Sequence, residues 1–205
     1  PAPDILLHNE GPGPDGRIRF RDVTATAGLS QTIGTGFCVV CADFNGDHWP
    51  DLYVANDMYP NRIWMNNRDG TFTDAGLASG AAVNYLGVGE ASMGVALGDV
   101  DSDGDWDLLA THFTDETNTL YLNDGGDFRD VTEQWQLGLA SRQHTGWGVS
   151  FVDLDHDGHV DLPLANGLAL PCHWRTTDQD RQGDIIDVDK LATQTRGPAI
   201  DPSTY

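Results

Sequence analysis

An all-β fold made of β-propeller blades is predicted by three features of this 205-residue sequence. An acidic loop occurs three times, beginning at Asp43, Asp99 and Asp153, so that successive copies start 56 and then 54 residues apart. A short apolar run precedes each loop and another follows it, and a hairpin-like segment lies beyond the first two loops. A repeat of this length with about four short strands is typical of one blade of a propeller.

The strands of each unit follow from these apolar runs. The acidic loops are preceded by GFCVVCA, SMGVALG and GWGVSFV, and they are followed by LYVAN, LLATH and LPLAN. Two further strands are expected in NRIWMNNRDGTFTD and in NTLYLNDGGDFRD, where the dipeptides DG and GG favour a hairpin turn. A version of this hairpin with a longer turn, ILLHNEGPGPDGRIRFRDVT, begins at Ile5.

These units add up to about three blade equivalents. The N-terminal segment forms the second half of a blade, two whole blades follow, and the strands around Gly148 and Leu162 form the first half of another. Because propellers usually close with about four to eight blades, we expect an arc that belongs to a larger propeller or is completed by a partner chain. Residues 1–167 are predicted to be blades. Residues 168–205 do not repeat the hairpin and are predicted to be an irregular tail or docking segment.

The charge balance narrows the classes of partner. Lys and Arg number 11 against 32 Asp and Glu, a net charge of -21. This excludes nucleic-acid binding, which needs cations that face the phosphates. No apolar run approaches the roughly 18 residues that cross a bilayer, so we expect no membrane insertion by this chain. The acidic excess indicates a cation ligand instead.

The cysteines are interpreted as structural residues. Cys38 and Cys41 lie in an apolar run that reads as a strand, and residues three apart on a strand point to opposite faces. A disulfide between them is therefore not expected, and both are interpreted as small buried hydrophobic residues.

The acidic loops predict calcium sites. Carboxylates two residues apart repel one another unless a cation holds them. Each loop carries Asp or Asn at positions 1, 3 and 5 and Asp at position 9, and the backbone carbonyl at position 7 adds an oxygen. Ca²⁺ prefers such oxygen cages, whereas Mg²⁺ demands stricter geometry. We expect about three Ca²⁺ ions, one per loop; three copies in phase argue against the alternative of merely solvated acidic turns.

The first loop is expected to bind most weakly. The other two loops place Gly104 and Gly158 at position 6, where the chain bends sharply, but the first has His48 there. A non-glycine residue with a positive φ is uncommon. The first loop also has Asn45 in place of an acid at position 3.

A family resemblance covers most of residues 5–167. It lies in RFRDVTATAGL, CADFNGDHWPDLYVAND, GVALGDVDSDGDWDLLATHF, NTLYLNDGGDFRDVTEQ and TGWGVSFVDLDHDGHVDLPLANG. The chain resembles the FG-GAP/VCBS repeat proteins, Ca²⁺-binding propellers related to the integrin α-subunit head, and among them the bacterial branch associated with ASPIC/UnbV domains. The resemblance implies part of a seven-bladed propeller, with each Ca²⁺ in the hairpin that joins the first two strands of a blade.

The resemblance also implies the metal ligands and the location. Most family members are extracellular, periplasmic or surface-anchored, so an extracytoplasmic location is implied. Backbone carbonyls are the implied ligands at position 7, and side chains elsewhere. The implied ligands are Asp43, Asn45, Asp47, Trp49 and Asp51 in the first loop, Asp99, Asp101, Asp103, Asp105 and Asp107 in the second, and Asp153, Asp155, Asp157, His159 and Asp161 in the third.

A non-enzymatic, calcium-stabilised interaction or structural module is the function these features favour. It would bind a protein partner through loops held on a rigid scaffold, or serve as a peripheral subunit of a surface or membrane-associated assembly. A glycan-binding propeller is an alternative, because six Trp residues are many for this length. However, Trp147 aligns with Phe37 and Met93 at one repeat position, which indicates core packing.

An enzyme is the less favoured alternative. A propeller-based hydrolase or lyase could use His112, Asp115, Glu116 and His144 for acid–base work. The sequence has no nucleophile elbow of the form G-x-S-x-G, so we assign no catalytic residue.

Overall fold

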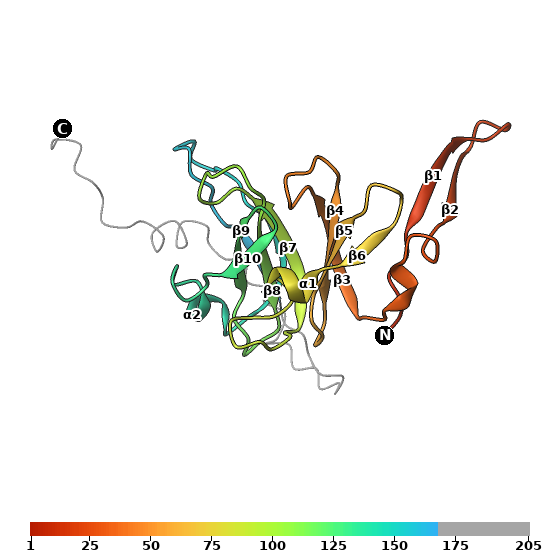
Figure 1. The fold of residues 1–205 in the computed structure, drawn as a ribbon. Coiled ribbons are helices and arrows are strands. Elements are labelled where there is room, and N and C mark those ends of the chain that lie inside the picture. The colour runs from red at the N-terminus through yellow and green to blue at the C-terminus, as the bar shows by residue number, and fades with distance from the viewer. Residues whose placement is uncertain (168–205) are drawn as a thin grey trace, which may run out of the picture.

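The computed structural model describes residues 1–167, which form four antiparallel β-sheets and only short helical turns (Figure 1). The predicted all-β architecture is confirmed. The strands are β1 (Leu7–Pro12), β2 (Ile18–Asp22), β3 (Gly36–Ala42), β4 (Asp51–Asn56), β5 (Arg62–Asn66), β6 (Phe72–Asp74), β7 (Ser92–Gly98), β8 (Asp107–His112), β9 (Thr119–Asp124), β10 (Asp127–Asp130), β11 (Thr145–Val149) and β12 (Leu164–Gly167). The helical turns are η1 (Leu29–Gln31), α1 (Gly76–Ser79) and α2 (Gly138–Ser141).

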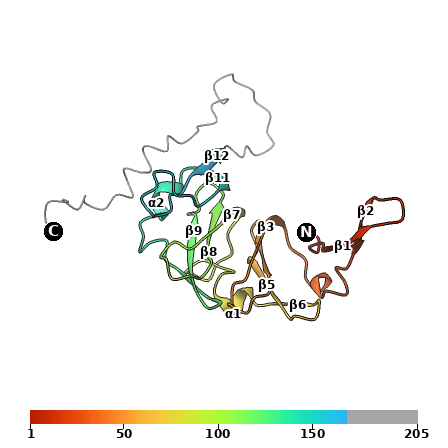
Figure 2. The same ribbon diagram turned by 90° about the horizontal axis from the view of Figure 1, so that it is seen from above.

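The sheets follow the predicted series of half-blade, two blades and half-blade. Strands β3 to β6 pair in sequence order, as do β7 to β10, so each set forms a complete four-stranded meander. In the described part of the chain, β1 pairs with β2 alone and β11 with β12 alone. Within residues 1–167 the sheets succeed one another along an arc and do not close a ring (Figure 2).

The hairpin turns form at the predicted dipeptides. Gly70 has a φ of 86°, and Gly125 and Gly126 have φ values of 60° and 103°. Glycine adopts this left-handed conformation without the steric cost of a Cβ. In the first hairpin the Asn67 N–H donates to the Thr71 carbonyl at 3.0 Å. The third and fourth strands of both complete blades are therefore joined as the sequence predicts.

The main hydrophobic core lies between the two complete blades. Tyr53 of β4 and Tyr121 of β9 are buried there, and the rings of Phe44 and Phe128 meet edge to face with centroids 5.7 Å apart. The Tyr53 hydroxyl donates to the Ala81 carbonyl at 3.1 Å, which satisfies its polar end. Because Phe44 belongs to the first acidic loop, this packing anchors that loop to the core.

The predicted shared core position of Phe37, Met93 and Trp147 is correct for Met93 only. Met93 is buried, whereas Phe37 and Trp147 are exposed. Met93 lies on β7, in the middle of the arc, where both faces of the strand are covered. Phe37 and Trp147 lie on β3 and β11, nearer the ends of the described arc, where neighbouring sheets cover less of each strand (Figure 2).

The cysteine prediction is correct in one respect and wrong in another. Cys38 and Cys41 are both free, as expected from their positions on opposite faces of β3. Cys38 packs against the main core. Cys41 is exposed, because it points to the face of β3 that no sheet of residues 1–167 covers.

Residues 168–205 lie outside the described part, so the predicted tail and the domain boundary after residue 167 remain predictions. Among residues 1–167, no helix is long and apolar enough to cross a membrane.

Candidate metal centres

The three acidic loops share one hydrogen-bond scheme. Each loop joins the first two strands of its blade, and both carboxylate oxygens of its first aspartate accept backbone N–H groups from positions 5 and 6. The bonds are Asp47 and His48 to Asp43 at 3.0 and 2.6 Å, Asp103 and Gly104 to Asp99 at 3.0 and 3.1 Å, and Asp157 and Gly158 to Asp153 at 3.2 and 3.0 Å. The loops therefore close around their first carboxylate.

The ninth residue of each loop ties the loop to its sheet. One oxygen of Asp107 accepts the Val100 N–H at 2.7 Å, and the other accepts the Asn123 N–H from β9 at 2.9 Å. Asp51 makes the same two bonds in the first complete blade. Asp51 and Asp107 are both fully buried. The third strand of a blade thus helps to position the loop between its first two strands.

Two residues in each loop adopt the left-handed backbone conformation, at positions 4 and 6. They are Gly46 and His48 with φ values of 70° and 67°, Ser102 and Gly104 with 64° and 101°, and His156 and Gly158 with 61° and 89°. The positive φ expected at His48 is present. Each loop nevertheless contains one glycine and one strained residue, so the first loop differs only in which position holds the glycine.

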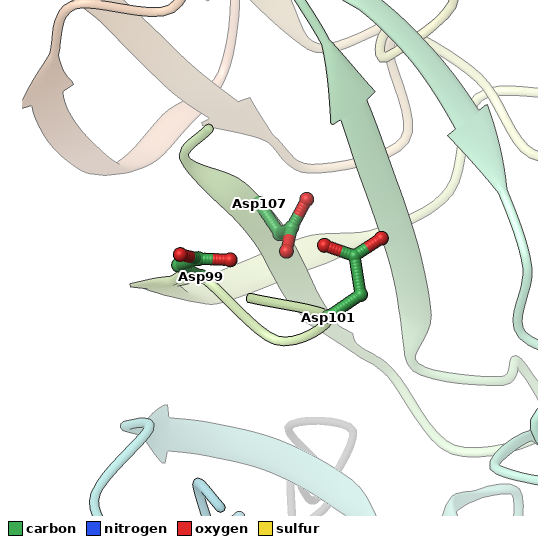
Figure 3. A group of neighbouring side chains, drawn as sticks. All are labelled: Asp99, Asp101 and Asp107. Atoms are coloured by element: carbon green, nitrogen blue, oxygen red, sulfur yellow. The ribbon is translucent and has the colours of Figure 1, made fainter. Parts of the chain in front are cut away.

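The second and third loops gather three carboxylates each. Asp99, Asp101 and Asp107 bring one oxygen apiece to within 4.8 Å of one another (Figure 3). Asp153, Asp155 and Asp161 do the same. A set of hard, charged oxygen ligands in a compact loop fits Ca²⁺ and excludes a soft thiolate-type site.

The structure does not bring the remaining predicted ligands into these triads. Asp103 and Asp157 lie outside the triads, and one oxygen of each accepts the backbone N–H two residues on, at 2.9 Å in both loops. The ligand roles of these two residues, of the triad residues, of the first-loop residues and of the position-7 carbonyls of Trp49, Asp105 and His159 all remain predictions.

The first loop differs in charge from the other two. Asn45 replaces an acid at position 3, and its side-chain oxygen accepts the Asp47 N–H at 3.1 Å. Arg68, in the turn between β5 and β6, donates to Asp47 Oδ2 from Nη2 at 2.8 Å and from Nε at 3.1 Å. This guanidinium lowers the pKa of Asp47 below its ordinary value. An internal cation thus already faces one of the predicted calcium ligands.

Burial and like charge act together on the buried aspartates. The pKa of Asp107 is raised to about 6, mainly by burial. The charges of Asp101 and Asp103 also raise it, whereas the hydrogen bonds donated by Asn123 and Val100 lower it. Repulsion of this kind favours a bound divalent cation, which would stabilise all three carboxylates in the ionised state.

Sequence reasoning missed two contributors to these loops. Asn66, the last residue of β5, and Asn123, the residue before the end of β9, donate their backbone N–H groups to Asp51 and Asp107. The signal for this role was present, because Asn recurs at this repeat position. The contact of Arg68 with Asp47 had no such signal, since the other hairpin has no Arg there.

The residues considered for acid–base catalysis are largely structural. His112 is fully buried, with Nδ1 2.8 Å from the Thr117 carbonyl and Nε2 3.0 Å from the Ser92 hydroxyl. The Glu116 carboxylate accepts the Ala91 N–H at 2.8 Å. The Asp115 N–H donates to the Arg142 carbonyl at 2.9 Å, and Arg142 Nε donates to the Asp115 carbonyl at 3.2 Å. Both ring nitrogens of His112 therefore have hydrogen-bond partners within the fold.

The protein should lose stability in acid through His112. Burial lowers the pKa of His112 to about 4, against the raising effects of the Thr117 carbonyl and of the Glu116 and Asp130 charges; Glu90 also lies 3.7 Å from Nε2. Between about pH 6.5 and 4 the unfolded chain binds a proton at this histidine that the folded chain does not. We expect a loss of about 3 kcal/mol across this window.

Urea unfolding at pH 7 and pH 4.5 tests this. His112→Gln should be less stable than the wild type at pH 7, and the gap should narrow at pH 4.5. The burial of Glu90 and Glu116 raises the pKa of each, so these groups work in the opposite direction. An equal pH dependence in both proteins would show that His112 does not govern the acid loss.

Comparisons with known proteins place the repeat in a family. A model of the FG-GAP-like repeat matches residues 43–110 and 99–162. Cartilage acidic protein 1 of Homo sapiens is 32% identical over 172 residues, which cover 80% of this chain and 24% of the relative. The protein of that name in Mus musculus is 31% identical, over 80% of this chain and 25% of the relative. That of Xenopus tropicalis is 27% identical, over 74% and 22%.

The chain thus spans about a quarter of the length of these relatives. The two repeat matches begin at the first residues of the first and second acidic loops and together cover more than half of the sequence. The repeat read from the sequence and the blades of the structure therefore coincide, and the chain belongs to the FG-GAP-like repeat family.

Proposed function

We propose that this chain is a calcium-stabilised, non-enzymatic module that works outside the cytoplasm and binds a protein partner or serves as a structural subunit. The observation that carries the proposal is the pair of carboxylate triads at the same place in two successive repeats. A single acidic cluster is common without a metal. Two equivalent ones, each closed by the same hydrogen bonds, indicate a ligand that the repeat is built to hold.

Calcium would act on stability. In its absence the triad carboxylates repel one another, and Asp107 remains buried beside two like charges. A bound ion removes this repulsion and pins the loop to its sheet through the ninth-position aspartate. Because the unfolded chain cannot form the cage, the binding free energy adds to the free energy of unfolding.

The proposed location follows from the kind of site. The Ca²⁺ sites of extracellular modules have a Kd of roughly 10⁻⁴–10⁻³ M, and sites of that strength fill only where Ca²⁺ is near millimolar, as it is outside the cell. The relatives bear the name cartilage acidic protein, and this chain shares the acidic character with a net charge of -21. Blades stiffened at the loops would then offer a steady surface to a protein partner.

Calorimetric titration of the chelated protein with Ca²⁺ tests the proposal. We expect two tighter sites and a weaker one in the first loop. Asp101→Ala should remove one tight site, whereas Asp127→Ala, an exposed aspartate at the start of β10, should remove none. Heat signals identical in the two variants, or no binding up to several millimolar Ca²⁺, would contradict it.

Arg68 should weaken calcium binding in the first loop. Its guanidinium occupies Asp47 Oδ2 and repels an incoming cation. We expect Arg68→Gln to tighten the weak site severalfold and to leave the other two unchanged, as seen in the same titration. Arg17→Gln, in the exposed turn between β1 and β2, is the matched control. A weak site that is unchanged or further weakened by Arg68→Gln would show that Arg68 does not compete with the ion.

A further inference from the structure

The turn between β9 and β10 lies between the first and the second acidic loop. On one side, the Gly125 N–H donates to Asp105 Oδ2 of the second loop at 2.7 Å. On the other side, a Cβ on Gly126 would lie only 3.3 Å from Asn45 Cβ of the first loop. The turn belongs to the second complete blade, so the contact with Asn45 crosses the boundary between the blades.

Asn123, near the end of β9, bonds to both loops and to this turn. Its backbone N–H donates to Asp107 Oδ1 at 2.9 Å, and its side-chain Nδ2 donates to the Phe44 carbonyl of the first loop at 2.9 Å. Its Oδ1 accepts the Gly126 N–H at 2.8 Å. The backbone of Asn123 thus holds the second loop, while its side chain holds the first.

These bonds form a continuous chain between the ninth-position aspartates of the two loops. The Phe44 N–H donates to Asp51 Oδ2 at 3.1 Å, and the Phe44 carbonyl accepts Nδ2 of Asn123. Asn123 in turn donates its N–H to Asp107. None of the four residues is more than 3% exposed. Because buried groups cannot exchange these bonds for bonds to water, displacing one carboxylate disturbs the rest of the chain.

Asn66 occupies the same repeat position in the first complete blade and provides a comparison. Its backbone N–H donates to Asp51 at 2.7 Å, as that of Asn123 does to Asp107. Its Nδ2, however, donates to the Pro50 carbonyl at 3.0 Å, in the loop of its own blade. The bond of Asn123 to Phe44 is therefore a feature of this junction and not of the repeat position.

We propose that Asn123 is a positioning residue that couples the two calcium sites, so that an ion in the second loop tightens binding in the first. This inference rests on the proposed calcium function. In the absence of an ion, the carboxylates of the second triad repel one another. An ion would keep Asp107 where it accepts the Asn123 N–H. The Asn123 side chain then keeps Phe44, and with it Asp51, in place. By linkage, an ion in the first loop tightens the second by the same factor.

Charge alone would couple the two sites in the opposite direction. A filled second triad carries one net negative charge, because the ion offsets two of its three carboxylates. A triad that has lost both Asp101 and the ion carries two. The more negative neighbour attracts a cation more strongly, so electrostatics predicts a tighter first site when the second is emptied this way. The hydrogen-bond chain predicts a weaker one.

A Ca²⁺ titration of ¹⁵N-labelled protein tests the direction. The amide signals of Asp47 and His48 report on the first loop, because both groups donate to Asp43. Asp101→Ala removes the second ion without breaking a bond of the chain, since Asp101 is exposed and outside it. We expect the first-loop Kd to rise about fivefold or more. Asp155→Ala, which changes the corresponding triad of the third loop, should leave this Kd unchanged.

Asn123→Ala completes a double-mutant cycle. It should weaken the first loop, and adding Asp101→Ala to it should weaken that loop no further. A merely structural role of Asn123 would lower the affinity and leave the response to Asp101→Ala intact. Asn66→Ala is the matched control and should keep the response, because the side chain of Asn66 bonds within its own blade.

The coupling and the calcium function fail in different ways. A first-loop Kd that is unchanged or lowered in Asp101→Ala, in a protein that still binds calcium, would overturn the coupling alone. This arm needs only the exposed substitution, so it decides the matter even if Asn123→Ala does not fold. A wild-type protein that binds no calcium in either loop would overturn both proposals.

Discussion

Asp107→Ala will destabilise the protein by about 2–4 kcal/mol even when all calcium is chelated. Asp107 is fully buried and accepts the N–H groups of Val100 and Asn123. Alanine leaves both donors without an acceptor, and a buried donor without a partner costs about 1–3 kcal/mol. The variant will also lose the calcium site of the second loop, so its deficit will be larger still in Ca²⁺.

Urea unfolding with and without Ca²⁺ separates these two effects. Asp101→Ala is the matched variant, because Asp101 belongs to the same triad but is exposed. It should be at least as stable as the wild type in chelator, because it lacks a charge that repels Asp107, and it should fall behind only in Ca²⁺. If both variants lose the same stability in chelator, the buried bonds of Asp107 are not what joins the loop to its sheet.

Gly94→Ala should cost about 3 kcal/mol or more, because it forces apart two blades. A Cβ at Gly94 would lie 1.8 Å from the carbonyl oxygen of Trp147 and 3.1 Å from Thr111 Oγ1. The Trp147 oxygen is backbone and cannot rotate away, so β7 and β11 must separate. The Gly94 N–H also donates to Thr111 Oγ1 at 2.9 Å, a bond that the shift would stretch.

Gly148→Ala is the control for this substitution. Gly148 occupies the same repeat position on β11, but a Cβ there would only make ordinary contact with Ala165 Cβ at 3.6 Å. Urea unfolding should show little change for Gly148→Ala and a large loss for Gly94→Ala. Equal losses would mean that alanine destabilises both strands through its strand propensity, and that the close approach between the blades at Gly94 is not the cause.

The order of strands, loops and turns along the chain was predictable from the repeat. Asp43, Asp99 and Asp153 mark the loops, the apolar runs around them mark the strands, and glycine dipeptides mark the hairpin turns. All of these signals are local, since they depend on residues that are neighbours in sequence. They sufficed to predict two complete blades flanked by two half-blades.

Burial at the ends of the arc was not predictable from the repeat. Phe37 and Met93 occupy the same repeat position, yet only Met93 is buried. Whether such a residue is covered depends on which sheets pack beside it, and a repeat pattern in the sequence does not say how many sheets do so. The exposed Cys41 has the same cause.

The acidic loops were predictable in outline and not in detail. The spacing of the aspartates identified both triads, but it did not distinguish Asp107, which the sheet holds by two bonds, from the exposed Asp101. The backbone angles were needed to show that positions 4 and 6 of every loop both have a positive φ, with glycine at only one of the two. The ion pair of Arg68 with Asp47 depends on the hairpin turn reaching over the loop, a tertiary contact without a sequence signal.

Thermal unfolding in excess EDTA and then in millimolar Ca²⁺ tests the central claim most directly, with Mg²⁺ as the control cation. Ions that bind only the folded chain raise its midpoint by mass action, and occupancy of two or three loops should raise it by about 10 °C or more. Mg²⁺ at the same concentration should give a much smaller rise, because it demands a stricter geometry. A folded chain whose midpoint is the same in EDTA and in Ca²⁺ would contradict the account, since the triads would then be acidic turns held by their hydrogen bonds alone.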